Sequence, residues 1–319
     1  MKSHFEQICN SVDEIFDKNM SKRFNNLLSQ RMRGMLSSNS MILDRQLFTP
    51  TLIDIAVTKL HSGKAPGVDL LQKEHLLNAH PILYDALANL FYLILITGYV
   101  SNHFGCGIIV PIQKDTSIKG FQKSDNFRGI TLSPIITKIF EHCILFIYRN
   151  YLKSNDRQFC FKQNLSCTHA IFCLRNVIDF FVTNDSTVNV CCLDISKAFD
   201  RLNHNCLFLK LLQLSVPISL IMVLKNWYSK LYSRVRWGCA LSDEFKITCG
   251  IRQGGVISPI LFNIYVDNIL AKMSKYGCKM KGISCSAFMY ADDLVLLSPS
   301  VYELQIMIKV CCDELKDIN

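Results

Sequence analysis

The sequence lacks the features that mark several classes of protein. None of its fifteen cysteines is spaced as C-x-x-C or as another zinc-binding pattern, so we expect reduced, mostly buried thiols in an intracellular protein. The N-terminal stretch carries charges where a signal peptide needs an apolar core, which argues against secretion. The longest apolar run, residues 86–100, is too short to span a bilayer and predicts a buried helix. No repeat or low-complexity tract is present, and no membrane partner is expected.

Size bounds the number of domains, and charge bounds the kind of partner. With 319 residues, 50% of them hydrophobic and 19% charged, the chain can bury a large core as one domain or as two subdomains. The 35 basic side chains exceed the 26 acidic ones, which gives a formal charge of +9. Such a charge suits nucleic acid or an anionic membrane surface, although a basic solvated face is the commoner explanation.

The N-terminal half predicts mainly helices. Residues 1–48 are polar with scattered apolar positions, which favours helix. A further helix should begin at a threonine cap, either Thr49 or Thr51, and end in a Gly/Pro loop. The stretch 105–114 predicts a short strand that stops at Pro111 and is followed by a lysine-rich loop.

A Ser-Pro pair then predicts the start of another helix. Ser133 would be the capping residue and Pro134 would occupy the first helical turn. The same arrangement recurs at Ser258 and Pro259, after a Gly-Gly turn. We therefore expect two long helices that begin in the same way.

The C-terminal half contains the acidic residues of interest. Residues 188–194 predict a strand on which alternate side chains share one face, and that face ends in the carboxylate of Asp194. Residues 287–298 read as strand, turn, strand, although the turn lacks the glycine that two-residue hairpins prefer. This turn carries the adjacent carboxylates Asp292 and Asp293.

Adjacent aspartates in a turn usually have only a local structural role, because the side chain bonds its own backbone. If the hairpin packs beside the strand that ends at Asp194, however, three carboxylates converge. Like charges in a half-buried site need positive charge, and hard divalent cations with oxygen ligands supply it. Two Mg²⁺ ions, with Mn²⁺ as an alternative, would then stabilise an in-line phosphoryl displacement.

Seven ordered segments resemble the reverse transcriptases of non-LTR (LINE-type) retrotransposons. They are GKAPGVD, IIVPIQK, NFRGITLSPIITKIFEHCIL, FCFKQNLSCTHAI, CCLDISKAFDRLNH, GIRQGGVISPILFNIYVDNIL and YADDLVLLS. The resemblance runs from about residue 62 to the end of the sequence. Single motifs such as YADD are only suggestive, but this series in this order is specific.

The resemblance implies an α+β fold of the right-hand polymerase type. Residues 1–50 would be an N-terminal helical extension and residues 51–185 the fingers. Residues 186–319 would form the palm, a ferredoxin-like antiparallel sheet backed by helices. By this resemblance the thumb and the endonuclease domain of the parent polyprotein are expected to be missing, so that the chain would be a fragment or a decayed copy of such an element.

The implied activity is that of an RNA-directed DNA polymerase. Its partners would be an RNA template, a DNA primer and dNTPs, joined by two-metal transfer to the primer 3′-hydroxyl. By resemblance, Asp194 and Asp292 would be the principal ligands of two Mg²⁺ ions. Asp293 would assist them, and the backbone carbonyl of Ile195 would complete one metal site.

Other residues match nucleotide-binding positions of the family. Phe199 matches the steric gate that excludes a 2′-hydroxyl, and its alternative is an ordinary core aromatic. Gln253 and Gly254 match the loop against the incoming nucleotide, and alternatively form a turn before a capped helix.

Three further residues have weaker matches. Arg128 resembles the arginine that braces the triphosphate, with a surface ion pair as its alternative. Tyr290 would pack near the primer end, or simply fill the hairpin core. Lys64 would contact phosphate, or be a plain loop lysine.

Two departures from the family pattern bear on backbone conformation. Leu70 and Cys160 stand where the family has glycine, so either residue would strain a turn that needs positive φ.

Other functions stay open. The chain would otherwise be a truncated, inactive remnant that binds RNA or RNA/DNA hybrid, an intron maturase, or an RNA-copying RNA polymerase, which Phe199 argues against. Localisation is expected to be intracellular, nuclear or cytoplasmic.

Overall fold

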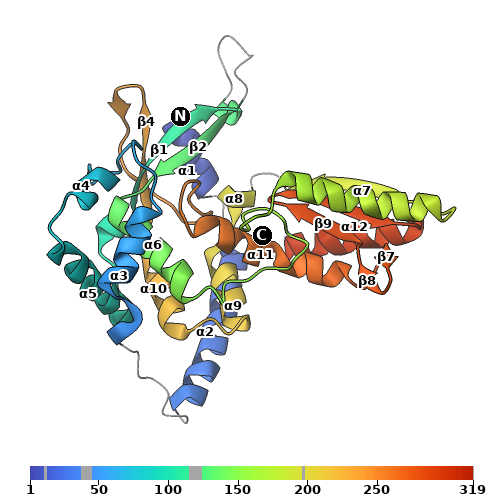
Figure 1. Ribbon diagram of the computed structural model, residues 1–319, viewed down its shortest axis with the longest axis horizontal. Coiled ribbons are helices and arrows are strands. Elements are labelled where there is room, and N and C mark those ends of the chain that lie inside the picture. Colours follow the sequence, from blue (N-terminus) through green and yellow to red (C-terminus); the bar gives the residue numbers. More distant parts are fainter. Residues whose placement is uncertain (11–12, 37–44, 115–123, 196–197, 319) are drawn as a thin grey trace. The chain divides into compact units, whose positions relative to one another are not determined.

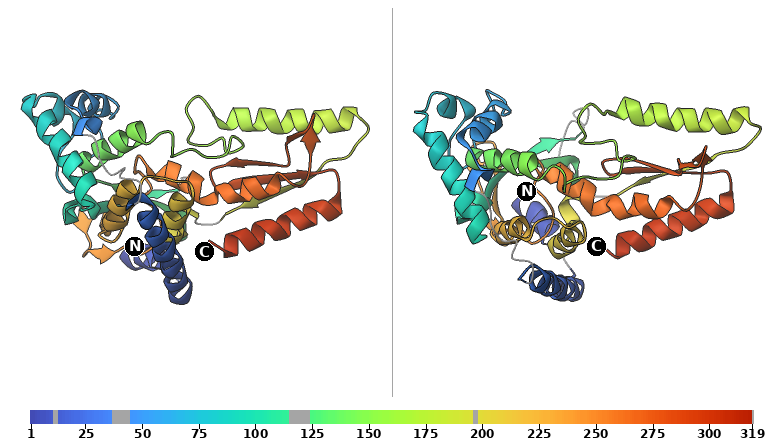
Figure 2. Two further views of the ribbon diagram at one scale, coloured as in Figure 1. Left: turned by 90° about the horizontal axis from the view of Figure 1, so that it is seen from below. Right: turned by 60° about the horizontal axis from the view of Figure 1, so that its bottom comes forward.

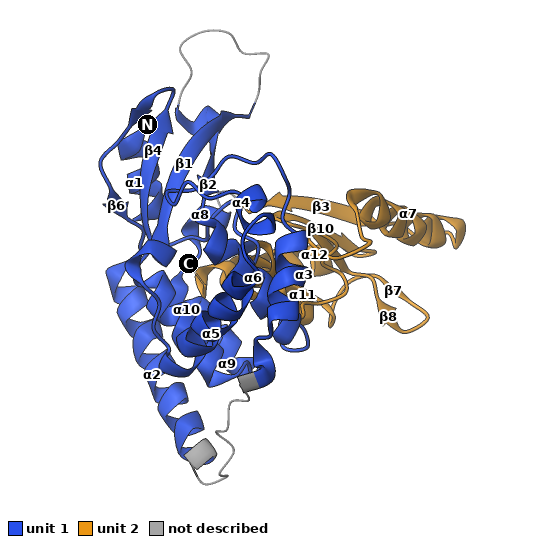
Figure 3. Cartoon of the chain, turned by 60° about the vertical axis from the view of Figure 1, so that its left-hand side comes forward, with its two compact units in different colours: residues 1–152, 199–258 blue, residues 153–198, 259–319 orange. Residues whose placement is uncertain are grey.

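The computed structural model describes residues 1–10, 13–36, 45–114, 124–195 and 198–318 (Figure 1). The fold mixes helices with antiparallel and parallel strand pairs. Two compact units divide the chain, each built from two separate segments (Figure 3). Unit 1 comprises residues 1–152 and 199–258, and unit 2 comprises residues 153–198 and 259–319.

Unit 1 contains most of the helices and one sheet. Its helices are α1 Lys2–Cys9, α2 Glu14–Leu36, α3 Pro50–Thr58, α4 Lys73–Leu77, α5 Ile82–Thr97, α6 Ile135–Ile147, α9 His204–Gln213 and α10 Ile218–Tyr228, with 3-10 turns at Arg45–Leu47, Asn102–Gly105 and Ser124–Asn126. Its strands are β1 Cys106–Gln113, β2 Phe127–Leu132, β4 Tyr232–Trp237, β5 Ala240–Leu241 and β6 Phe245–Lys246. The strand order is β2-β1-β4-β5, and β6 also pairs with β4.

Aromatic rings fill the core of unit 1. Phe140 of α6 lies 4.9 Å from Phe91 of α5, measured between ring centroids, and 5.9 Å from Phe104. Trp227 of α10 meets Phe104 edge to face at 5.9 Å. Aromatic pairs in these geometries stabilise a core beyond the area that they bury.

Several expectations for unit 1 need correction. β1 does not stop at Pro111 but continues to Gln113. It pairs with β4 only from Cys106 to Ile109, so position 111 has a free edge that tolerates the missing N–H. The lysine-rich loop expected next lies largely outside the described residues. Helix α5 is not wholly buried, because Leu93 is 52% exposed.

The helix caps are partly as expected. Thr49, not Thr51, caps α3, since its hydroxyl accepts from the Leu52 N–H at 3.1 Å. Ser133 does not cap α6. The N–H of Ile135 is instead bonded at 2.9 Å by the carboxylate of Asp69, a residue 66 positions upstream.

Unit 2 consists of a three-stranded antiparallel sheet between helices. Its elements are α7 Cys167–Thr183, β3 Asn189–Asp194, β7 Lys279–Met280, β8 Ile283–Ser284, β9 Ala287–Tyr290, β10 Asp293–Ser298 and α12 Val301–Lys316. Helices α8 Ala198–Arg201 and α11 Ser258–Met273 begin at the boundaries between the units. The strand order is β3-β10-β9. Helix α7 covers one face against β9, and α12 packs against β10 and β3 on the other (Figure 2).

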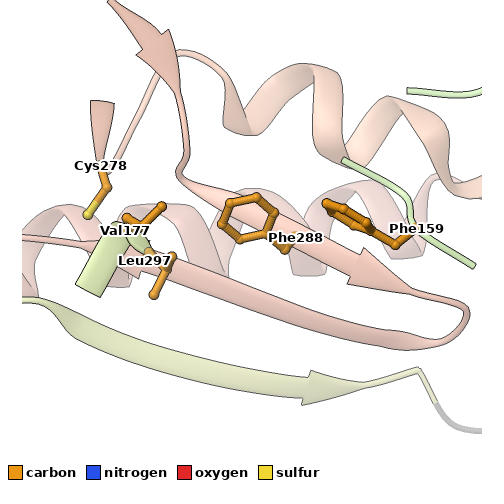
Figure 4. Packing of buried hydrophobic residues seen from close by; sticks show 5 residues of the cluster. All are labelled: Phe159, Val177, Cys278, Phe288 and Leu297. Carbon is orange, nitrogen blue, oxygen red and sulfur yellow. The ribbon is translucent and has the colours of Figure 1, made fainter. Parts of the chain in front are cut away.

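A small hydrophobic core joins α7 to the sheet. Val177 of α7, Phe288 of β9 and Leu297 of β10 meet there with Phe159 and Cys278 (Figure 4). The opposite face buries Leu294, Leu296 and Met289 almost completely. The two-residue period of β10 therefore sends its side chains into two different cores.

Two general expectations can be compared directly with the fold. None of the fifteen cysteines, all of which lie in the described residues, forms a disulfide. Only six of them are buried and four are exposed, so the buried thiols are not the majority that the sequence predicts. No helix in the described part of the chain is long and apolar enough to cross a bilayer.

Candidate active site

Two of the predicted metal ligands are direct cross-strand partners. Asp293, the first residue of β10, is paired with Asp194, the last residue of β3, and on its other side with Tyr290 of β9. Directly opposed residues of antiparallel strands project to the same face. The structure thus brings Asp194 and Asp293 together at one end of the sheet, although Asp194 lies 99 positions before Asp293 in the sequence.

The face that carries these carboxylates is open to solvent along β3. The burial of β3 alternates, and Val190, Cys192 and Asp194 are the exposed members. This is the face that the sequence predicts to end in a carboxylate. Asp293 is also exposed, whereas Asp292 in the turn is half-buried.

The turn between β9 and β10 is made by Ala291 and Asp292. Ala291 adopts the left-handed conformation, with φ of +55°. A residue with a Cβ atom pays roughly 1–2 kcal/mol there. The backbone N–H of Ile195 donates to the carbonyl of Asp292 at 3.1 Å, so the turn is tied to the chain just beyond β3.

The oxygen atoms at the turn between β9 and β10 are of the kind that binds a hard divalent cation. Carboxylates and a backbone carbonyl are the oxygen ligands that Mg²⁺ accepts. Within the described residues, however, no group of three or more His, Cys, Asp or Glu side chains is already spaced to hold a metal ion. The strand register places Asp194 and Asp293 side by side.

Tyr290 lies at the same end of the sheet and packs against the α7 core. The nearby Cys160 thiol, and after it burial, raises the pKa of the Tyr290 hydroxyl. Tyr290 is half-buried against this core, and it shares its face of the sheet with Asp194 and Asp293.

The predicted nucleotide loop lies in unit 1 and is held by glycine contacts. Gly254 has φ of +113°, and a Cβ atom there would lie 2.8 Å from the Thr131 carbonyl oxygen. The Gln253 side chain donates at 3.0 Å to the carboxylate of Asp200. The close approach of Gly254 is thus to the chain itself, on strand β2.

A buried carboxylate that the sequence reasoning missed supports this loop. Glu141 of α6 is 4% exposed and accepts from the Val256 N–H at 2.8 Å. Burial raises the pKa of Glu141 to about 7, opposed by the N–H groups of Val256 and Ile257 and by the charge of Arg252. Its only sequence signal is a charged residue on the apolar face of a helix.

Phe199 and Arg128 also lie in unit 1. Phe199 is half-buried, and its backbone carbonyl accepts from the Ile251 N–H at 2.8 Å, beside the loop of Gln253. Arg128 is exposed on β2, opposite Ile112 of β1. Its guanidinium has no ion pair within the described ranges, so the surface ion pair is not seen there.

Lys64 lines a basic pocket of about 270 Å³ in unit 1. The charged or titratable side chains among its lining residues are all basic: Lys59, His61, Lys64, Lys73, Lys138 and His142. The Lys73 ammonium is used internally, because it donates to the carbonyls of Thr58 and Leu60. Burial and the charge of Lys59 lower the pKa of His142 to about 4.

The two departures from glycine have different outcomes. Leu70 does adopt positive φ, at +56°, and its side chain is 73% exposed. Cys160 does not, and its neighbour Phe161 takes the left-handed conformation instead, with φ of +59°. Strain is therefore located at Leu70 and one residue after Cys160.

Comparison with known families supplies the decisive observation. The family model described as "Reverse transcriptase (RNA-dependent DNA polymerase)" matches residues 112–319, more than half of the chain. The chain belongs to the reverse transcriptase family. Its reverse transcriptase domain is similar to the RNA-directed DNA polymerases of non-LTR retrotransposons, as the ordered motifs predict.

Individual relatives come from transposable elements of Drosophila melanogaster. A retrovirus-related Pol polyprotein from a type-2 retrotransposable element is 24% identical over 87% of this chain and 26% of its own length. The probable RNA-directed DNA polymerase from transposon X-element is 29% identical over 77% of this chain and 27% of its own length. The reverse transcriptase chain thus spans about a quarter of the length of these relatives.

Among solved structures, telomerase from Candida albicans in complex with a fragment of telomeric RNA is similar to this chain. The TM-score is 0.49 and the sequence identity 14%, over 75% of this chain and 44% of the telomerase chain.

Proposed function

We propose that this reverse transcriptase domain extends a DNA primer on an RNA template with dNTPs. The observation that carries the proposal is the pairing of Asp194 with Asp293 at the hairpin tip. In this proposal Asp194, Asp292 and Asp293, with the carbonyl of Ile195, hold two Mg²⁺ ions. Bound there, the ions would supply positive charge to the attacking and leaving oxygens of the phosphoryl transfer.

The proposed roles of the other residues follow the family pattern. Residues 51–185 serve as fingers and residues 186–319 as palm. Phe199 excludes the 2′-hydroxyl of a ribonucleotide, and Gln253 with Gly254 shapes the nucleotide site. The exposed Arg128 guanidinium braces the triphosphate, and Tyr290 packs near the primer end.

The basic pocket of unit 1 supports binding to a polyanion. Lys59, Lys64 and Lys138 line one pocket, and no carboxylate is among the lining residues that the structure describes. Such clustering of like charge is favourable when a phosphate compensates it. We assign to Lys64 a contact with the phosphate backbone. The net charge of +9 is in accord with this assignment.

The experiment compares primer extension by the purified chain with extension by aspartate variants. The assay contains RNA template, DNA primer, dNTPs and Mg²⁺, and product length is read on a denaturing gel. We expect Asp194→Asn and Asp292→Asn each to lower incorporation by about a hundredfold or more, as for loss of a group that stabilises transition-state charge. Asp313→Asn removes a similar charge from the exposed side of α12 and should leave extension unchanged.

Two further arms separate the alternatives. Phe199→Val should raise ribonucleotide incorporation while extension with dNTPs continues, which a core aromatic would not produce. Fluorescence anisotropy with labelled hybrid then shows whether the chain binds without extending. Binding without extension by wild type would favour the inactive remnant, and equal extension by wild type and Asp194→Asn would overturn the proposed site.

A further inference from the structure

Residues 157–159 lie along the free edge of β9 in unit 2. The Met289 N–H donates to the Arg157 carbonyl at 2.9 Å, and the Phe159 N–H donates to the Met289 carbonyl at 2.9 Å. These bonds form a short parallel bridge between Gln158 and Met289. The segment therefore covers the edge of the sheet that β10 does not occupy.

Buried contacts anchor this segment on both sides of Gln158. Phe159 enters the core of unit 2, where its ring lies 6.0 Å from that of Phe288 (Figure 4). The amide of Asn263 on α11 donates to the Cys160 carbonyl at 2.9 Å. The Gln158 N–H itself donates to the Asn155 carbonyl at 3.0 Å.

The Gln158 side chain bonds both backbone groups of one turn residue. Its Nε2 donates to the Ala291 carbonyl at 3.3 Å, and its Oε1 accepts from the Ala291 N–H at 3.2 Å. Oε1 also accepts from the Cys160 N–H at 3.2 Å. Only this orientation of the amide matches a donor to each acceptor, and Gln158 is 1% exposed, so water does not compete for it.

Ala291 is the residue that most needs such support. It holds a left-handed conformation that glycine adopts freely and that alanine resists. The next residue, Asp292, is held from the other side by the Ile195 N–H. The turn that carries Asp292 and leads into Asp293 is thus fixed from the flanking segments on both sides.

We propose that Gln158 is a positioning residue that locks Ala291 in the left-handed conformation and so sets the direction of the Asp292 and Asp293 carboxylates. It does so through the backbone and touches neither carboxylate. The consequence for metal binding rests on the proposed function, whereas the effect on the turn does not.

The first measurement follows the turn alone. Gln158→Met keeps the length of the side chain and removes both hydrogen bonds, so exchange of the Ala291 amide hydrogen should accelerate about tenfold or more relative to the rest of β9. Asn263→Leu is the matched control, because it removes another buried amide that holds the same segment at Cys160. It should leave the relative protection of Ala291 unchanged.

The second measurement tests the positions of the carboxylates. It determines the affinity for Mn²⁺ by electron paramagnetic resonance. Gln158→Met should weaken Mn²⁺ binding about tenfold, and Asn263→Leu should not. Ala291→Gly should restore Mn²⁺ binding to the Gln158→Met variant, because glycine adopts positive φ without the two hydrogen bonds from Gln158. In the Ala291→Gly variant, Gln158→Met should weaken Mn²⁺ binding only about threefold or less. The effects of the two substitutions would then not add, whereas they would add if Gln158 had only a general packing role.

The outcomes separate the two proposals. If the wild type does not bind Mn²⁺, or if Asp194→Asn does not abolish its binding, the proposed metal site is wrong. The hydrogen-exchange measurement still tests the role of Gln158 in that case. If Gln158→Met leaves Ala291 exchange unchanged, or costs as much Mn²⁺ affinity in the Ala291→Gly background as in the wild-type background, the positioning role is wrong.

Discussion

The carboxylate of Glu141 accepts a hydrogen bond of 2.8 Å from the backbone N–H of Val256, two residues after Gly254. Burial raises the pKa of Glu141 from 4.5 to about 7. As pH rises through this interval, the unfolded chain releases the proton first. Stability contributed by the protonated group is therefore complete below pH 4.5 and lost as pH rises to about 7.

Glu141→Gln should remove this pH dependence, because the amide keeps an oxygen for the Val256 N–H and carries no charge. Relative to wild type, the free energy of unfolding of the variant should rise by about 1–3 kcal/mol between pH 5 and pH 7.5. Urea unfolding at several pH values measures it. Glu14→Gln, on the exposed side of α2, is the control, and a gap that stays constant with pH would contradict the prediction.

His204 should give the opposite pH dependence. Its Nε2 lies 2.7 Å from the Gly250 carbonyl, and burial lowers its pKa from 6.5 to about 4. The neutral ring thus contributes stability above pH 6.5 that is lost as pH falls toward 4. In His204→Gln the free energy of unfolding should therefore fall less with acid than in the wild type, by about 1–3 kcal/mol between pH 7 and pH 4.5.

The same unfolding series checks His204, with the exposed His61→Gln as control. If the acid side of the profile stayed equally steep in His204→Gln, the ring would take up its proton at the same pH in the folded and the unfolded chain, and the lowered pKa would be wrong.

Leu70→Gly should stabilise the protein, although it removes an apolar side chain. Leu70 is 73% exposed and has φ of +56°, so glycine relieves strain and loses little buried area. We expect a gain of about 0.5–1 kcal/mol after the added freedom of the unfolded chain is subtracted. Thermal unfolding measures it, and Leu77→Gly in helix α4 should instead destabilise by about 1 kcal/mol. Loss of stability in Leu70→Gly would refute the strain argument.

Gly254→Ala and Gly238→Ala form a matched pair. Both glycines have positive φ, but a Cβ atom at 238 meets open space, whereas at 254 it would lie 2.8 Å from the Thr131 carbonyl oxygen. Gly238→Ala should cost about 1 kcal/mol from conformation alone, and Gly254→Ala about 2 kcal/mol more from displacement of the loop. Chemical unfolding and hybrid binding compare the two. Equal losses would mean that the contact with β2 yields without cost.

Local patterns in the sequence predict most of the secondary structure near the candidate site. The alternation along β3 identified the face that ends in Asp194, and the run of apolar residues on both sides of Asp292 and Asp293 identified the hairpin. These features depend on the two-residue period, which any single strand displays. The meeting of Asp194 with Asp293 needed the hypothesis that the hairpin packs beside β3, and the register agrees with it.

Features set by distant contacts were not predictable in this way. Asp69 replaces Ser133 as the partner of the α6 N-terminus because the fold brings a loop 66 positions upstream to that helix. Pro111 is tolerated because β4 stops pairing with β1 before it. Gln158 lies in no pattern of charge or periodicity, and only its contacts with Ala291 distinguish it from an ordinary polar residue.

The pairing of β3 with β10 also constrains when unit 2 can fold. The hairpin of β9 and β10 is local and can form as soon as it is made, but β3 waits through about a hundred residues of synthesis for its neighbour. Until Ser298 has left the ribosome, both edges of β3 are unpaired, whereas pairing with β10 covers one of them in the described sheet. Chaperone dependence during translation should therefore be concentrated in this interval.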